Sequence, residues 1–392
     1  MSRNKKSTRG IVLAACAAAG AALLLSACTP PLPPDVLAAQ AEANITCQTG
    51  AQNVSLPEDF AGASDAVNAT LSGTCPDQSL VEVPAGDPAG LTITEMAPTA
   101  DQVAAFEKTC PSGSIIVPVF GYPVVLALNV VGLEGLVLTP KALAGILDGS
   151  ITSWTDPVIA DANPGIDLTG ITDITVMSLD HPSGAVNAMT AYLGKTAADS
   201  WTAGTVDTLS VGTKFPTTAD LITELTATDG AVAVLPAVQA VNAALPMASV
   251  DINGTTISVD DTQLLKVGVG ALTVTTDAKG NMVATPAVGG TPVPENFDAA
   301  AAKVVLADGQ EMIGWPILGI AHMMVCEDGK DPLPLSSAQF LVRLAGQGSL
   351  ETFGLTPLPE PVRVRTFVPL KVTAAAPSGA AAASAAASPA MS

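Results

Sequence analysis

Residues 174–193 read ITVMSLDHPSGAVNAMTAYL and contain the pattern that decides the fold. The apolar run from Ile174 to Met177 has the length and composition of a buried β-strand. Ser183 follows after a short polar loop, and its hydroxyl can cap a helix over residues 184–193. This order of strand, polar loop and capped helix indicates an α/β unit.

The same alternation extends along the chain on both sides of this stretch. Thr139 and Pro140 form an N-cap and N1 pair for a helix over residues 141–147, and Thr217 or Thr218 opens a helix that ends at Leu225. Other short apolar runs predict strands, and turn residues predict two hairpins. The strands are expected at residues 80–83, 91–94, 115–120, 124–130 and 231–235, and the hairpin turns at residues 253–254 and 279–281. We therefore expect an α/β protein with a mixed sheet.

The N-terminus has the features of a bacterial lipoprotein signal. Basic residues precede an apolar run from Ile11 to Leu25, which is shorter than the roughly 20 residues that a membrane-spanning helix needs. Small residues then precede Cys28, as in a lipobox, so we expect a signal peptide over residues 1–27 and lipidation of Cys28. The alternative is an ordinary cleavage site beside a chance cysteine.

Two low-complexity segments flank the folded part. The Pro-rich residues 28–43 are predicted to act as a tether that holds the fold at the outer face of the bacterial cell membrane. Residues 373–392 contain almost only Ala, Ser, Pro and Gly, and we expect them to be disordered.

Composition excludes several classes of partner. The 392 residues are enough for two lobes, and 36 acidic residues against 16 basic ones give a net charge of −20. Loss of the four basic residues in the signal peptide would leave −24, so nucleic acid is not an expected partner. Only His181 and His322 could supply imidazole ligands, and no CxxC motif occurs, so we expect no metal and no cofactor. No nucleophile and base form a catalytic constellation, so we do not expect an enzyme.

Export places the remaining cysteines in an oxidising compartment. Four cysteines lie outside the signal peptide and its lipobox, and they allow three pairings. We favour one bond that closes a loop of moderate length and one that ties a distant C-terminal segment to the first lobe. These pairs are Cys47 with Cys75 and Cys110 with Cys326.

Motifs over residues 90–365 resemble the PstS-type phosphate-binding proteins of ABC importers. The likeness is clearest where Leu138–Pro140, the segment ITSWTDP at residues 151–157 and the pair Ser183–Gly184 follow in this order. All the tryptophans of the chain fall on tryptophan positions of the family, namely Trp154, Trp201 and Trp315.

The resemblance implies an α/β, two-lobed periplasmic binding protein-like fold of type II, with mixed sheets and two hinge crossings. The crossings are expected near residues 117–124 and 300–316. Lobe 1 would be discontinuous, over residues 44–120 and 310–366, and lobe 2 would span residues 121–309. The return segment would include a strand at residues 317–325 and a helix at residues 336–344.

In such proteins phosphate lies between the lobes and is held by helix N-termini, hydroxyls, an arginine and a carboxylate. This chain departs from that pattern, because no arginine occurs between Arg9 and Arg343 and His181 stands where the carboxylate is expected. Lys214 could replace the arginine, although an ordinary surface lysine is the simpler interpretation, as is a core position for His322. The ligand-binding candidates are Thr49, Gly50, Glu95, Asp180, His181, Ser183, Gly184 and Lys214.

Two functions remain open at this point. The first is a lipid-anchored extracytoplasmic solute-binding protein that captures phosphate or another small anion and delivers it to an ABC permease. The second is an accessory or surface interaction lipoprotein that has the binding-protein fold and no longer binds phosphate. The family resemblance favours the first function, and the altered loops favour the second.

Overall fold

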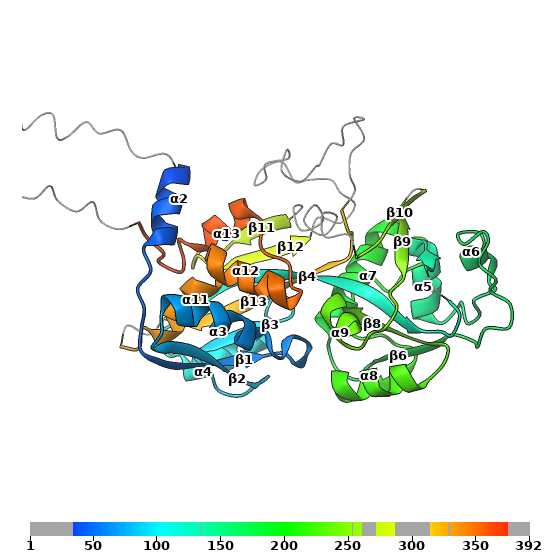
Figure 1. Cartoon of the computed structure of the whole chain (residues 1–392), viewed down its shortest axis with the longest axis horizontal. Helices are drawn as coiled ribbons and strands as arrows, with labels where there is room; N and C mark the ends of the chain where they lie inside the picture. The colour runs from blue at the N-terminus through cyan, green and yellow to red at the C-terminus, as the bar shows by residue number, and fades with distance from the viewer. Residues whose placement is uncertain are drawn as a thin grey trace, which may run out of the picture. The chain divides into compact units, whose positions relative to one another are not determined.

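Strand β4 (Ser114–Asn129) links the two halves of the main sheet. All of its residues except the first and the last are buried. Its first part pairs antiparallel with β13 (Leu318–Cys326), and its last part pairs antiparallel with β8 (Ala231–Pro236). The strand order of the sheet is β2-β1-β3-β13-β4-β8-β6-β7. One strand therefore passes from the first half of the sheet into the second (Figure 1).

This computed structural model describes residues 34–133, 135–252, 254–260, 272–286, 314–327 and 330–374. The predicted signal peptide, Cys28, most of the second hinge crossing and nearly all of the predicted disordered tail lie outside these residues. The sheet belongs to a compact unit that spans Ile45–Val372. No helix among the described residues is long and apolar enough to cross a membrane.

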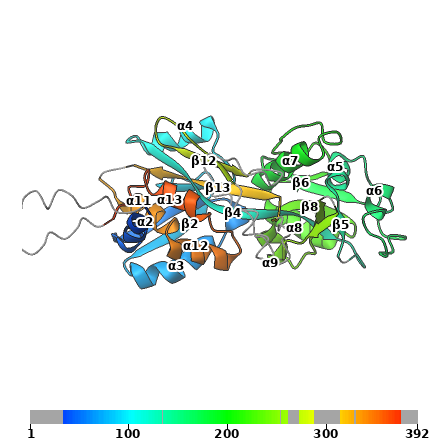
Figure 2. The same ribbon diagram turned by 90° about the horizontal axis from the view of Figure 1, so that it is seen from above.

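The first half of the sheet is built from parallel strands that β13 joins in the antiparallel direction. Helices cover one face, and another helix with a hairpin covers the opposite face, as Figure 2 shows. The strands are β1 (Gly50–Leu56), β2 (Gln78–Pro84) and β3 (Leu91–Thr94). One face carries α3 (Ala63–Thr74), α11 (Leu333–Leu341) and α12 (Leu344–Phe353), and the other carries α4 (Ala100–Thr109) and the hairpin β11 (Leu272–Thr276) and β12 (Met282–Pro286).

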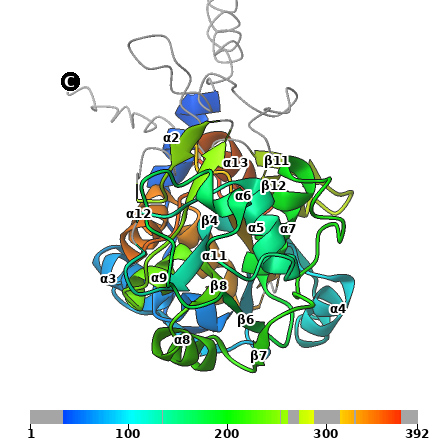
Figure 3. The ribbon, with the colours of Figure 1, turned by 90° about the vertical axis from the view of Figure 1, so that its right-hand side faces the viewer.

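The second half has the same layered arrangement. Strands β8 and β6 lie between two pairs of helices (Figure 3). One pair is α5 (Pro140–Asp148) and α7 (Gly184–Thr196), and the other is α8 (Thr218–Ala227) and α9 (Ala237–Asn242). The remaining elements are β6 (Thr175–Leu179), the edge strand β7 (Thr213–Phe215), α6 (Pro157–Ala160) and a small sheet of β5 (Val137–Leu138), β9 (Ser249–Ile252) and β10 (Thr255–Ile257).

The predicted helix starts are confirmed. Thr139 accepts a hydrogen bond from the backbone N–H of Ala142, and Ser183 accepts one from Val186. Thr217, rather than Thr218, caps α8. Both predicted hairpins also form, as β9–β10 and β11–β12.

Three predicted elements differ from the structure. Residues 115–120 and 124–130 do not form separate strands, because Gly121 and Tyr122 stay paired with β13 and β4 continues through them. The helix predicted at residues 336–344 is α11, which ends at Leu341; Arg343 is extended and α12 begins after it. Part of the predicted tether, Pro34–Ala43, is the helix α2, since its Ala-rich sequence favours helix after an initial proline.

The favoured cysteine pairing is confirmed. Cys47 bonds to Cys75 and Cys110 bonds to Cys326. The second bond lies in a small buried cluster with Phe106, Ile116 and Met324, so it joins the end of α4 to the end of β13.

The β11–β12 hairpin contacts the first half of the sheet. The Ala284 N–H donates to Nε2 of His322, and the Ile116 N–H donates to the side-chain oxygen of Asn281. His322 is a core histidine, as expected, and burial lowers its pKa to about 4. The lobe boundaries at residues 120 and 310 remain a prediction, and the hairpin packs on lobe 1 elements although residues 121–309 are assigned to lobe 2.

Candidate functional site

The N-terminus of α7 meets a carboxyl group from the other half of the sheet. Glu95 follows the end of β3, and its carboxylate accepts a hydrogen bond from the backbone N–H of Gly184, the first residue of α7. The hydroxyl of Tyr122, on β4, donates to the backbone carbonyl of Glu95 at 2.8 Å. A helix N-terminus attracts anions because its first N–H groups have no partner within the helix. At α7 a side chain of the protein itself occupies that place.

The contact at Gly184 leaves no room for a further group. A Cβ atom on Gly184 would lie 2.4 Å from Cβ of Glu95 and 2.4 Å from the hydroxyl oxygen of Tyr122. Gly319 on β13 is equally restricted, because its Cβ would lie 2.0 Å from the ring of Tyr122. The Tyr122 side chain thus fits only because both neighbours are glycines, and the two halves of the sheet touch directly here.

A second carboxyl contact lies at the N-terminus of α8. Glu58 and Asp59 directly follow β1, within the short 3-10 helix η2 (Glu58–Phe60). The Glu58 carboxylate accepts from the backbone N–H groups of Thr218 and Ala219, both at 3.1 Å. The Thr218 hydroxyl donates to Asp59 at 2.7 Å, and the side-chain amide of Gln239 donates to the Asp59 backbone carbonyl at 2.7 Å.

Burial makes the two inner carboxyl groups harder to ionise. It raises the pKa of Glu95 to about 8, and the nearby charge of Asp59 raises it further while the Gly184 N–H opposes the shift. Burial also raises the pKa of Asp59 to about 6; the Thr218 hydrogen bond lowers it, Glu58 raises it and His181 lowers it. The pKa of Tyr122 lies well above its ordinary value, again chiefly because of burial. Glu95 and Asp59, two buried acids on the same side of this contact, therefore bind protons at higher pH than ordinary carboxyl groups do.

The solved structures that resemble this chain are phosphate-binding proteins. A high-affinity periplasmic phosphate-binding protein, PfluDING, with bound phosphate, superimposes with a TM-score of 0.57 at 16% identity, over 82% of this chain and 93% of that one. A human phosphate-binding apolipoprotein superimposes with a TM-score of 0.54 at 14% identity, over 81% of this chain and 94% of that one. These likenesses show a type II periplasmic binding protein fold with two lobes.

The proteins that resemble this chain in sequence are also named phosphate-binding proteins. The phosphate-binding protein PstS 2 of Mycobacterium tuberculosis (strain ATCC 25618 / H37Rv) is 24% identical over 268 residues, which are 67% of this chain and 68% of the relative. The phosphate-binding protein PstS 3 of Mycobacterium leprae is 30% identical over 149 residues, 36% of this chain and 40% of the relative. No family model matches the chain. This chain is similar in sequence to the PstS phosphate-binding proteins.

The PstS-like chain brings only some of the predicted site residues together. Ser183, Gly184 and Glu95 meet at the N-terminus of α7. Asp180 and His181 lie exposed on the loop before that helix, where His181 is close enough to Asp59 to lower its pKa.

Lys214 lies on the edge strand β7 rather than in this contact. Its ammonium donates to the Ser178 hydroxyl at 2.8 Å and to the Leu209 carbonyl. Burial lowers its pKa, and Asp180 opposes the shift. The described hydrogen bonds of Lys214 thus go to residues of its own half of the sheet, and none of them goes to a carboxyl group of the other half.

Thr49 and Gly50 lie away from this contact, and their part in ligand binding stays a prediction. Gly50 begins β1, and the contact with α8 follows the far end of this strand, about 20 Å away at the usual rise per residue. The residues at the contact are Glu58 and Asp59. The sequence could have indicated Glu58 and Asp59, because they come after the apolar end of β1 and ligand sites in such sheets lie beyond the carboxyl ends of the strands.

The remaining residues that the prediction missed are Tyr122, Thr218 and Gln239, which only the tertiary fold brings to Glu95 and Asp59. Among the described residues, no group of three or more His, Cys, Asp or Glu side chains could hold a metal ion. The relatives are named as binding proteins, which agrees with the expectation that the chain is not an enzyme.

Proposed function

We propose that this PstS-like chain is an exported, lipid-anchored protein with the binding-protein fold that does not bind phosphate in the manner of its relatives. The observation that carries the proposal is the hydrogen bond from the Gly184 N–H to the Glu95 carboxylate. A phosphate at the α7 N-terminus would need this N–H group and the space that Glu95 fills. The chain would then act as an accessory or surface interaction protein.

Electrostatics support this proposal. A phosphate dianion between the lobes would approach the carboxylates of Glu58 and Asp59, and like charges repel strongly where water is excluded. No arginine between residues 9 and 343 is available to offset these acids. The site therefore has acids, and no arginine, where a buried anion needs cations and many donors.

The second candidate function is a receptor that captures phosphate or another small anion and passes it to an ABC permease. It is favoured by the capped helix at Ser183 and by relatives that are named phosphate-binding proteins. In this case the lobes would have to separate so that Glu95 leaves the α7 N-terminus. Binding would then carry the free-energy cost of opening, which weakens the apparent affinity.

Calorimetric titration of the full chain, purified in detergent, with inorganic phosphate tests the choice. We expect no saturable heat up to millimolar phosphate. The Glu95→Ala variant frees the Gly184 N–H, so any phosphate binding should be tighter in this variant than in the unchanged chain. Saturable micromolar binding by the unchanged chain that Ser183→Ala weakens would instead establish the receptor.

Membrane attachment is tested separately by fractionation of the producing cells. Cys28 is the proposed lipidation site, and two or more acyl chains account for stable attachment without a spanning helix. The Cys16→Ser variant, which changes a cysteine inside the signal peptide, is the matched control. Cys28→Ser should abolish acylation, seen as loss of lipid label and of the mass of the acyl chains, while Cys16→Ser should keep both. Equal labelling of the two variants would refute the anchor.

A further inference from the structure

A cavity of about 520 Å³ opens at the end of the first half of the sheet, away from the contact at Glu95. It lies where four separate segments meet: the first residues of β4, the end of β13, the turn of the β11–β12 hairpin and the residues around the end of α13 (Glu360–Thr366). Ile115 in its wall is seven residues from Tyr122 along β4, or about 23 Å at the usual rise. Its volume is in the range of small-molecule sites.

Basic side chains gather around this cavity in a chain that is otherwise strongly acidic. Lys279, Arg365 and Lys371 line it, which places three of the 16 basic residues at one site, and Glu327 is the one acid among the described residues of the lining. We propose that the cavity binds a small organic anion, with its acidic group held by these three cations. The proposal is independent of the function assigned to the inter-lobe contact.

The rest of the lining fits the organic part of such a ligand. Ile115, Met282, Val368 and Pro369 contribute apolar surface beside the cations. Val368 is 83% exposed, which is unusual for a large apolar side chain and leaves it available to a ligand. An apolar wall with a few charged groups is typical of sites for small organic molecules.

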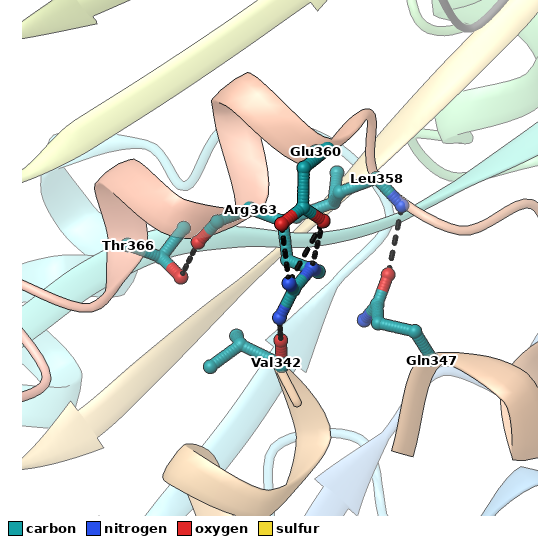
Figure 4. A network of polar contacts seen from close by, with 6 residues as sticks. All are labelled: Val342, Gln347, Leu358, Glu360, Arg363 and Thr366. Carbon is teal, nitrogen blue, oxygen red and sulfur yellow. Dashed lines mark hydrogen bonds and ion pairs between the residues drawn. The ribbon is translucent and has the colours of Figure 1, made fainter. Parts of the chain in front are cut away.

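Buried contacts hold in place the helix that carries Arg365. Arg363 is buried on α13, where it forms a bidentate ion pair with Glu360 and donates to the Val342 carbonyl, while Thr366 bonds to the Arg363 carbonyl (Figure 4). This network fixes the helix that carries Arg365. The guanidinium of Arg365 in turn reaches the Thr276 hydroxyl of the hairpin at 3.5 Å.

The hairpin that carries Lys279 is also held in place. His322 and Asn281 accept the hydrogen bonds that tie it to β13 and β4, and the Cys110–Cys326 bond fixes the end of β13 next to Glu327. A binding site on such supports needs little reorganisation when a ligand enters.

The acids that pair with Lys279 and Lys371 do not neutralise these two cations. Glu327 pairs with Lys371, and Glu107 lies 4.0 Å from Lys279, but both pairs are well exposed to solvent. Exposed ion pairs contribute little free energy, so an anionic ligand can replace them at low cost. Asp277 is occupied by the N–H groups of Lys279 and Asn281 within the turn.

Calorimetric titration of the full chain with phenyl phosphate tests the proposal, since this probe combines an anion with an apolar ring. We expect saturable binding, and a dissociation constant that rises about tenfold in Arg365→Gln and in Lys279→Gln, because each variant removes one cation from the site. Lys195→Gln on α7 changes an exposed base far from the cavity, so it should leave the dissociation constant unchanged.

Three results would overturn the proposal. They are the absence of saturable binding, an equal effect of Lys195→Gln and Lys279→Gln, and loss of phenyl phosphate binding in Ser183→Ala. The last result would place the probe at the α7 N-terminus, so it separates this cavity from the inter-lobe contact. The exposed position of Lys279 keeps the test valid if Arg365→Gln does not fold.

Discussion

The inter-lobe contact and the basic cavity are opposites in charge and in construction. At the contact, Glu58, Asp59 and Glu95 from the first half of the sheet occupy the N-termini of α7 and α8. At the cavity, Lys279, Arg365 and Lys371 belong to the lining. Hydrogen bonds and close packing hold the contact together. At the cavity, a disulfide supports the wall, because Glu327 in the lining directly follows Cys326.

The difference shows that a shared fold does not transfer a shared site. Type II binding proteins and this chain have the same layered lobes, and under the proposed function the acidic residues after β1 and β3 of this chain change which charge can bind between the lobes. The distribution of charge over the fold, rather than the fold itself, sets where an anion can bind.

The disulfide beside the cavity gives the largest expected effect. Replacing Cys110 and Cys326 together by serine should lower the free energy of unfolding by about 5 kcal/mol, because the bond spans 216 residues of sequence. The matched change at Cys47 and Cys75, which lie 28 residues apart, should cost about 3.5 kcal/mol. Urea unfolding of both variants measures the difference, and a larger loss for the shorter loop would contradict it.

Close packing at the contact gives the next effect. Gly184→Ala should lower the free energy of unfolding by about 2 kcal/mol or push the two halves apart, since the new methyl group overlaps Glu95 and Tyr122. Gly194→Ala in the same helix is the control, because nothing lies within 4 Å of its Cβ, and it should be neutral or slightly stabilising. Urea unfolding and small-angle scattering report the two outcomes, and equal behaviour of the two variants would show that the contact is not tight.

Titration of the contact gives the smallest effect, when it is taken per unit of pH. The folded state keeps a proton on Glu95 up to a pKa of about 8, whereas the ordinary value is 4.5. The folded chain thus binds more protons than the unfolded chain in this window, so the free energy of unfolding should decrease as pH rises from 4.5 to 8, by at most about 1.4 kcal/mol for each unit of pH. Thermal unfolding at a series of pH values measures this slope.

Glu95→Gln should flatten that slope, because the amide does not titrate. Asp199→Asn changes an exposed acid and should leave the slope as it is. If the two variants have the same pH profile, Glu95 is not the group that links pH to the contact.

Much of the fold was predictable because its signals are local. The caps at Thr139, Ser183 and Thr217, the two hairpin turns and most of the strands depend on the chemistry of a few neighbouring residues. The continuous strand β4 was not predictable in this way. The sequence around Gly121 and Tyr122 predicts the end of one strand and the start of another. These residues stay extended because they pair with β13, almost 200 residues later in the chain.

The candidate site was predictable only in part, and for the same reason. Ser183 and Gly184 follow from the helix start, and Glu95 follows from its place after β3. Asp59 and Tyr122 do not carry a local signal of their role, because they meet Glu95 only through the packing of the two halves. Thr49 and Gly50 lie at the opposite end of β1 from Glu58 and Asp59, and the sequence alone does not show which end of a strand faces the other half of the sheet.

The sequence by itself determined the alternation of strands and helices, the export and lipidation signals as predictions, the excess of acid and the absence of a cleft arginine. These are properties of composition and of short segments. The tertiary structure decided that Glu95 lies on the Gly184 N–H and that Lys279, Arg365 and Lys371 surround one cavity. Both are encounters between residues far apart in the chain, and no local pattern specifies which distant side chains will meet.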